Sequence, residues 1–168
     1  MKKLVVLLGL VGLLLVPGAA QAQFSLGVQG NHATDNIDWG VGARAGFDFR
    51  QMGQPIRLVG SFDYFFPGSA SGVDVTYYEF NLNAVYISSI RAELDTWVGL
   101  GLNIASFEST LSGSSTPISE FNRAGLNLLG GARYNTGKAI GIFGEFRFEV
   151  EGGELLVFTF GVDYTFGK

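Results

Sequence analysis

Hydrophobic and polar positions alternate along most of this chain, and the cleanest run lies between residues 37 and 50. Every second residue of that run is apolar: Trp39, Val41, Ala43, Ala45, Phe47 and Phe49. The residues between them are glycine or charged: Asp38, Gly40, Gly42, Arg44, Gly46, Asp48 and Arg50. Because successive side chains of a β-strand point to opposite faces, this period of two predicts a strand with one apolar and one polar face.

Eight segments of this kind follow one another, separated by turn-like stretches. They span residues 23–30, 37–50, 56–66, 75–87, 93–106, 121–134 and the two arms of 142–166, which join at Glu151-Gly152-Gly153. Short turns are expected at 51–55, 88–92 and 135–138, and longer loops at 31–36, 67–74 and 107–120. Trp97 breaks the pattern, because it stands at a polar position of the fifth segment. The sequence therefore predicts an all-β, eight-stranded antiparallel up-and-down barrel.

Alternation alone does not say which face is inside, but side-chain volume does. The interior of an eight-stranded barrel is just wide enough to be filled by side chains. The apolar positions carry some fifteen large aromatic residues, which would overfill that space. The polar positions combine long charged residues with many glycines, and this mixture suits a crowded interior. We therefore predict charges inside and apolar side chains outside; a soluble lipocalin-like barrel, with the opposite orientation, is the remote alternative.

The charged positions also predict an ion-pair network. Six arginines and seven acids stand at polar positions, without any lysine. Arginine paired with carboxylates is typical of desolvated, forked ion pairs. The predicted interior network comprises Arg44, Asp48, Arg57, Asp63, Glu79, Arg123, Arg133, Glu145, Arg147, Glu149 and Asp163.

The apolar face is expected to contact lipid. In an up-and-down order, Phe47, Tyr86 and Tyr164 fall near the short turns, whereas Trp39 and Tyr78 fall near the longer loops. Aromatic residues at two heights with Leu, Val and Ala between them are typical of a transmembrane barrel. Short periplasmic turns and longer extracellular loops are expected, and a closed barrel satisfies its backbone hydrogen bonds in lipid.

The first residues predict export. Lys2 and Lys3 precede an apolar run, and Ala20-Gln21-Ala22 is a small-x-small cleavage site, so residues 1–22 are expected to be a signal peptide cut between Ala22 and Gln23. The remaining residues 23–168 are expected to form one barrel domain. Without Lys2 and Lys3 the net charge of −4 becomes −6, which argues against nucleic acid as a partner. The absence of cysteine excludes disulfides and thiolate chemistry.

The C-terminal segment carries a motif: Thr159, Gly161, Tyr164 and Phe166, a polar residue, a glycine and two aromatics at fixed spacing. This motif is similar to the outer-membrane β-signal, and the chain from residue 23 onward resembles the small outer-membrane barrels of the OmpA, OmpX and opacity type. The resemblance implies an outer-membrane location, contact with lipid and lipopolysaccharide, and insertion by the barrel-assembly machinery. We also expect a monomer, with no cofactor and no metal site. Gly167 and Lys168 depart from the family, which often ends at the final Phe.

Because that family has many functions, the fold does not give the function. The leading prediction is a structural or surface-contact protein whose interior is plugged by the Arg–carboxylate network. A narrow channel and an enzyme that modifies lipid A are the alternatives. The enzyme would use His32, the sole histidine, expected in the first outer loop near Asp35 and Asp38.

Overall fold

The computed structural model describes residues 23–34, 37–67, 73–111, 117–137, 139–150 and 155–167. The predicted signal peptide, residues 1–22, lies outside the described residues, while Gln23, on the far side of the predicted cleavage site, begins the first strand. Within the described ranges, no helix has the length and apolar character needed to cross a membrane.

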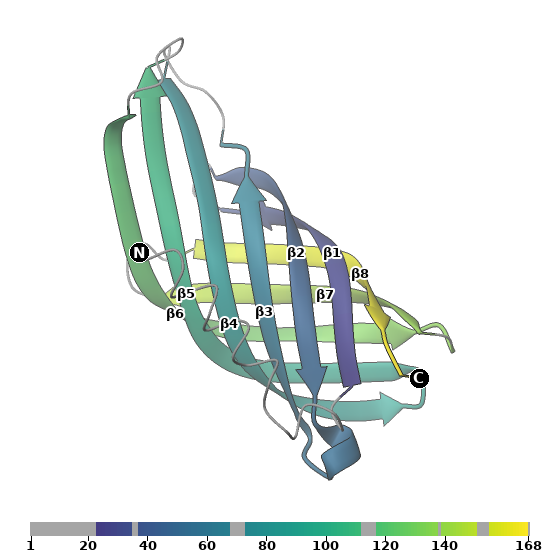
Figure 1. Ribbon diagram of the computed structural model, residues 1–168. Helices are drawn as coiled ribbons and strands as arrows, with labels where there is room; N and C mark the ends of the chain where they lie inside the picture. Colours follow the sequence, from purple (N-terminus) through teal and green to yellow (C-terminus); the bar gives the residue numbers. More distant parts are fainter. Residues whose placement is uncertain are drawn as a thin grey trace.

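Eight strands close into a single antiparallel barrel (Figure 1). They are β1 (Gln23–Ala33), β2 (Asp38–Asp48), β3 (Ile56–Phe65), β4 (Val73–Arg91), β5 (Leu94–Leu111), β6 (Pro117–Asn135), β7 (Ile140–Val150) and β8 (Leu155–Thr165). Each strand pairs with its neighbours in sequence, and β1 pairs with β8 from Ser25↔Thr165 to Ala33↔Val157 to close the ring. The predicted up-and-down topology is confirmed.

One end of the barrel, here called the short-turn end, carries the tight connections. A 3₁₀ turn at Arg50–Met52 links β2 to β3 and ends at Gly53, whose φ of 75° is left-handed and suits glycine. Gly137, in the turn between β6 and β7, has a φ of 76° for the same reason. The first residue of β1 and the last residue of β8 also lie at this end, because β1 and β8 are antiparallel neighbours.

At the opposite, long-loop end, the stretch predicted to be irregular, 107–120, is largely strand. β5 continues to Leu111 and β6 begins at Pro117, and the two remain paired through Thr110↔Pro117. β6 pairs with β7 only from Leu126↔Val150 onward, so the upper parts of β5 and β6 rise above the rim as a projecting hairpin, with the start of β4 beside it (Figure 1). The sequence prediction was wrong here because residues 107–120 do not alternate between apolar and polar, whereas the backbone pairing of two strands does not require alternation.

Two other connections are also shorter than predicted. β1 continues to Ala33, within the loop expected at 31–36, and β4 continues to Arg91, within the turn expected at 88–92. A register irregularity between Ser89 and Arg91 accompanies the end of β4. In both places the ladder hydrogen bonds extend pairing beyond the point at which the side-chain pattern fades.

Candidate functional site in the barrel interior

The barrel encloses charged side chains and exposes apolar ones, which is the opposite of the arrangement in a soluble protein. Val98 and Leu100, on the outer face of β5, are 65% and 66% exposed, whereas Arg147 on the inner face of β7 is 1% exposed. The other charged residues with buried side chains are Arg44, Asp48, Arg57, Asp63, Glu79, Asp95, Arg133, Glu145, Glu149 and Asp163. A lipocalin-like barrel would point its apolar residues inward, whereas this barrel points them outward.

The interior consists of four layers stacked along the barrel axis. From the short-turn end to the long-loop end they are here called the lower network, the lower apolar layer, the upper network and the upper apolar layer. Polar and apolar layers therefore alternate, and each network of charges has an apolar layer on its long-loop side.

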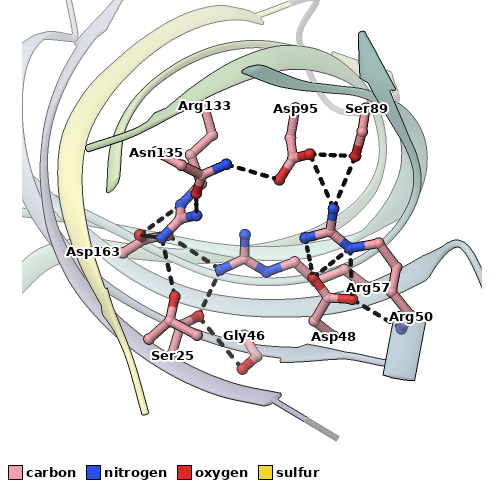
Figure 2. A network of polar contacts seen from close by, with 11 residues as sticks. Ser25, Gly46, Asp48, Arg50, Arg57, Ser89, Asp95, Arg133, Asn135 and Asp163 are labelled. Atoms are coloured by element: carbon pink, nitrogen blue, oxygen red, sulfur yellow. Dashed lines mark hydrogen bonds and ion pairs between the residues drawn. The ribbon is translucent and has the colours of Figure 1, made fainter. Parts of the chain in front are cut away.

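The lower network is centred on Asp163 (Figure 2). Its carboxylate accepts hydrogen bonds from Arg133 Nε at 2.8 Å and from Arg57 Nη2 at 3.2 Å, and Arg133 Nη2 lies 2.6 Å from Asp163 Oδ1. The same Arg57 nitrogen donates to Ser25 Oγ at 2.5 Å, and Arg133 Nη2 donates to Thr165 Oγ1 at 3.0 Å. Two arginines from β3 and β6 thus share one carboxylate of β8, which links strands on different sides of the barrel.

Arg50 closes the short-turn end of this network. Its guanidinium lies 2.7 Å from Asp48 Oδ2 and 2.9 Å from Asp95 Oδ1, so it bridges β2 and β5 (Figure 2). Asp95 also accepts from Ser89 Oγ at 2.5 Å. Partial burial lowers the pKa of Arg50, but its hydrogen bonds and Coulomb attraction to Asp48 and Asp95 outweigh that effect and raise the pKa above its ordinary value.

The lower apolar layer explains the residue that breaks the alternation. Its members are Val59, Val85, Ile87, Trp97, Leu129 and Phe143. Trp97 points inward and donates from Nε1 to Glu145 Oε2 at 2.9 Å, which satisfies the only polar atom of the indole. Arg44 lies over the Phe143 ring at 4.2 Å and 3.5 Å from Glu145. Among the described residues, Arg44 Nε and Nη1 have no hydrogen-bond partner.

The upper network is organised around Arg147. Its Nη2 lies 2.7 Å from Glu79 Oε2, and its Nε lies 2.8 Å from Glu149 Oε1. Asp63 is 3.6 Å from Nη2. Asp63 is 0% exposed and accepts hydrogen bonds from four neutral side chains: Gln29, Asn31, Ser61 and Asn81.

Asparagines complete this network, and sequence reasoning did not single them out. Asn127 donates to Asn81 Oδ1 and Asn83 Oδ1, both at 2.9 Å, while Asn103 donates to Glu149 Oε2 at 2.7 Å. Each of these asparagines stands at a polar position of its strand. That position was the sequence signal that could have predicted their inward orientation. The upper apolar layer, Ala33, Phe65, Tyr77, Ala105, Leu155 and Val157, lies beyond them toward the long-loop end.

Outside, an apolar belt is flanked by two groups of aromatic residues. At the short-turn end, Phe24 stacks with Phe166 at 5.7 Å and contacts Phe47 at 5.0 Å. Towards the long-loop end, Phe62 and Phe80 are 4.8 Å apart, and other pairs are Trp39–Phe160, Tyr64–Phe66 and Phe62–Tyr78. Exposed aliphatic side chains lie between them: Leu26, Val28, Val41, Leu82, Val98, Leu100, Leu102, Leu126, Leu128 and Val162.

Several bacterial outer-membrane proteins of solved structure have the same architecture. Neisserial surface protein A matches with a TM-score of 0.65 and 14% identity, over 86% of this chain and 96% of that chain. Ail, the attachment invasion locus protein of Yersinia pestis, matches with a TM-score of 0.60 and 16% identity, over 86% and 97%. The N-terminal β-barrel domain of Pseudomonas aeruginosa OprF matches with a TM-score of 0.58 and 16% identity, over 87% and 100%.

The chain has the fold of the small outer-membrane β-barrels. No family model matches the sequence, and no curated protein is significantly similar to it. At these identities the likeness shows the fold alone. In this outer-membrane barrel fold, therefore, the residues themselves must indicate the function.

The motif that resembles the assembly signal lies on β8 and just beyond it. Thr159 points inward and is buried, where its hydroxyl donates to Asn31 Oδ1 at 2.8 Å. Gly161 shares that inner face, and a Cβ there would lie 2.7 Å from the Phe143 ring. Tyr164 and Phe166 point outward and contact each other with ring centroids 4.8 Å apart.

Two predicted site residues lie elsewhere than expected. Arg123 stands at an inward position of β6, but its side chain is exposed, unlike the other arginines of the predicted network. It precedes Leu126, where β6 begins to pair with β7, so it lies at the rim and not in the enclosed interior. His32 is on β1 and not in a loop, and its ring lies 4.7 Å from that of Trp39 on the outer face.

His32 Nδ1 has no hydrogen-bond partner among the described residues. Over the same residues, no three His, Cys, Asp or Glu side chains are grouped so as to hold a metal ion. The candidate site is thus the layered interior itself, together with the belt around it.

Proposed function

We propose that the protein is an integral outer-membrane β-barrel with a structural or surface-contact role, whose interior is plugged rather than open as a wide pore. One observation carries the proposal: the apolar belt with its two aromatic groups is outside, and the ion pairs are inside. In lipid such a belt costs nothing to expose, and a closed barrel leaves no strand edge unpaired within the hydrocarbon. In water the same belt would be a very large exposed apolar surface.

The plug is supported by the contacts that cross the interior. Arg147 of β7 reaches Glu79 of β4, and Arg57 of β3 reaches Asp163 of β8. The two apolar layers fill the space between and beyond these bridges. Solutes would have to displace four successive layers, which supports a closed barrel over the alternative of a narrow channel.

Surface contact is proposed for the long-loop end, where the projecting hairpin rises above the rim. Ail is named for attachment and invasion, and one of its structures contains the heparin analogue sucrose octasulfate. In this chain the segments of that end are acidic in sequence: Asp35, Asp38, Asp74, Glu108, Glu120, Glu151 and Glu154. Their negative charge would repel a sulfated polyanion, so we propose that the partner of this end is not a polyanion.

Fractionation and gel migration test the membrane assignment. The expressed protein should sediment with outer membranes, and the folded barrel should migrate differently in unboiled and boiled detergent samples. Recovery of the full chain in a soluble fraction, with the same mobility before and after boiling, would overturn the proposal.

We further propose that Thr159, Gly161, Tyr164 and Phe166 serve as the signal that the assembly machinery reads. The F166A variant should insert more slowly into vesicles that contain the machinery, yet at the wild-type rate into bare vesicles. Phe160→Ala is the matched control, because Phe160 is an exposed aromatic of the same strand outside the motif. Equal assembly rates for F166A and F160A would remove this assignment.

Finally, we propose that the protein is not an enzyme. The His32 ring lies tilted against Trp39 at the outer face, an arrangement that supports a role in the aromatic group rather than in catalysis. Lipid A from cells that express the wild-type protein, the H32A variant or no protein should be identical by mass spectrometry. A modification that depends on His32 would contradict this proposal.

A further inference from the structure

A small cavity lies inside the lower network, at the short-turn end of the barrel. Its volume is about 10 Å³, and its walls are formed by Gln23, Ser25, Asp48, Arg50, Arg57, Arg133 and Thr165. A space of this size holds about one particle as large as a water molecule. It therefore has room for a monatomic ion, whereas sulfate, phosphate and larger anions do not fit.

Arg57 brings to this cavity N–H groups that the protein does not use. The residue is only 8% exposed, and its hydrogen bonds to Ser25 Oγ and Asp163 Oδ2 both leave from Nη2. Its Nε has no hydrogen-bond partner among the described residues. In Figure 2 the third nitrogen of the guanidinium points toward the centre of the barrel, without a contact to the other residues drawn. Buried donors of this kind are costly unless another acceptor meets them.

The charges beside Arg57 are also unequal. Arg57 and Arg133 share the single carboxylate of Asp163, so these three residues carry one positive charge in excess. All three are buried, which makes an uncompensated charge expensive. The unused donors and the excess charge thus lie on the same side of the cavity.

The carboxylate in the cavity wall does not cancel this charge, because it already has a cation. Both oxygens of Asp48 accept from Arg50, at 3.1 Å for Oδ1 and 2.7 Å for Oδ2. Asp95, the second acidic partner of Arg50, is not part of the wall. The lower network is therefore neutral as a whole, while its charge is positive at Arg57 and Arg133.

We propose that this cavity binds one small monovalent anion of the halide class, held by charge-assisted hydrogen bonds from Arg57. The guanidinium of Arg133 and the hydroxyl groups of Ser25 and Thr165 complete its surroundings. These residues belong to β3, β6, β1 and β8, so the bound anion links strands on both sides of the β1–β8 closure. An anion that binds only the folded barrel raises its stability. The site is independent of the surface role proposed above.

Thermal unfolding of the refolded barrel in detergent tests the site, with sodium chloride compared with sodium gluconate. Equal concentrations keep the ionic screening constant, and gluconate is too large for the cavity. The Tm of the wild-type protein should be about 4 °C higher in chloride. Arg57→Gln should lose this difference, whereas Arg91→Gln, which replaces an exposed arginine outside the cavity, should keep it. Equal wild-type Tm values in the two salts, or an undiminished difference in R57Q, would overturn the proposal.

A crystal of the wild-type barrel grown in sodium bromide locates the anion directly. Bromide is a halide of similar size to chloride, and its anomalous X-ray scattering distinguishes it from water. A peak should lie in the cavity beside Arg57 and Arg133. Maps without a peak at that position would contradict the site. Should R57Q not fold, this measurement on the wild-type protein decides.

Discussion

Arg147 is the residue on which the upper network depends most, because it is the cation nearest to three enclosed carboxyls. Removal of one partner from a buried ion pair leaves charge without compensation, which typically costs about 3–5 kcal/mol. The R147A variant should therefore lower the free energy of unfolding by that amount, as measured by urea titration of the barrel in lipid vesicles. Arg147→Lys should recover little, since one ammonium cannot reproduce the fork that reaches Glu79 and Glu149.

The control for this substitution is Arg91→Ala, because Arg91 is an exposed arginine at the end of β4. Its loss should change the free energy of unfolding by less than about 1 kcal/mol. Equal effects of R147A and R91A would mean that the interior network contributes nothing specific to stability.

Gly131 tests the packing of the lower apolar layer. A Cβ at this position would lie 2.5 Å from Trp97 Cζ2 and 2.5 Å from the Gly144 carbonyl oxygen. Gly131→Ala should therefore displace the indole, weaken its hydrogen bond to Glu145 and destabilise the barrel by about 1–3 kcal/mol. Urea titration followed by tryptophan fluorescence measures both effects. Gly60→Ala is the matched control, because the nearest atom to its Cβ, the Asn81 carbonyl oxygen, is 3.8 Å away.

Among the strands, the projecting hairpin of β5 and β6 is separable from the barrel. It lies beyond the pairing of Leu126 with Val150, and both networks lie below it. Replacement of residues 108–120 by Asn-Gly should leave Phe107 and Phe121 paired across a two-residue turn. The shortened protein should keep its heat-modifiable migration and a Tm close to that of the wild type. Loss of folding would show that the hairpin belongs to the cooperative unit.

The strands show where sequence reasoning succeeds and where it stops. The period of two placed most of the strands and oriented them correctly, because polar side chains are enclosed inside the barrel and apolar ones lie on its outer face at alternate residues. It failed at 107–120, where the residues do not alternate although β5 and β6 remain paired. It also could not say that Arg147 meets Glu79 or that Arg133 meets Asp163. Those pairs depend on the stagger of strands across the barrel, which the pattern of one strand does not record.

On the scale of the whole molecule, the plug that we propose consists of alternate charged and apolar layers. The networks fix strands across the interior with directional contacts, such as Arg57 to Asp163. The apolar layers exclude water from those contacts, which strengthens them. Because four successive layers cross the interior, we expect closure not to depend on any single residue.

This redundancy predicts the electrical behaviour of the barrel. Wild-type protein reconstituted in a planar lipid bilayer should carry no steady, wide-pore current. The double variant Trp97→Ala with Phe143→Ala empties much of the lower apolar layer, yet it should remain closed, because the upper network and the upper apolar layer persist. Heat-modifiable migration of each protein confirms that the barrel has folded before the recording. Regular conductance steps from the wild type would favour the narrow channel, whereas steps from the double variant alone would place the whole seal at Trp97 and Phe143.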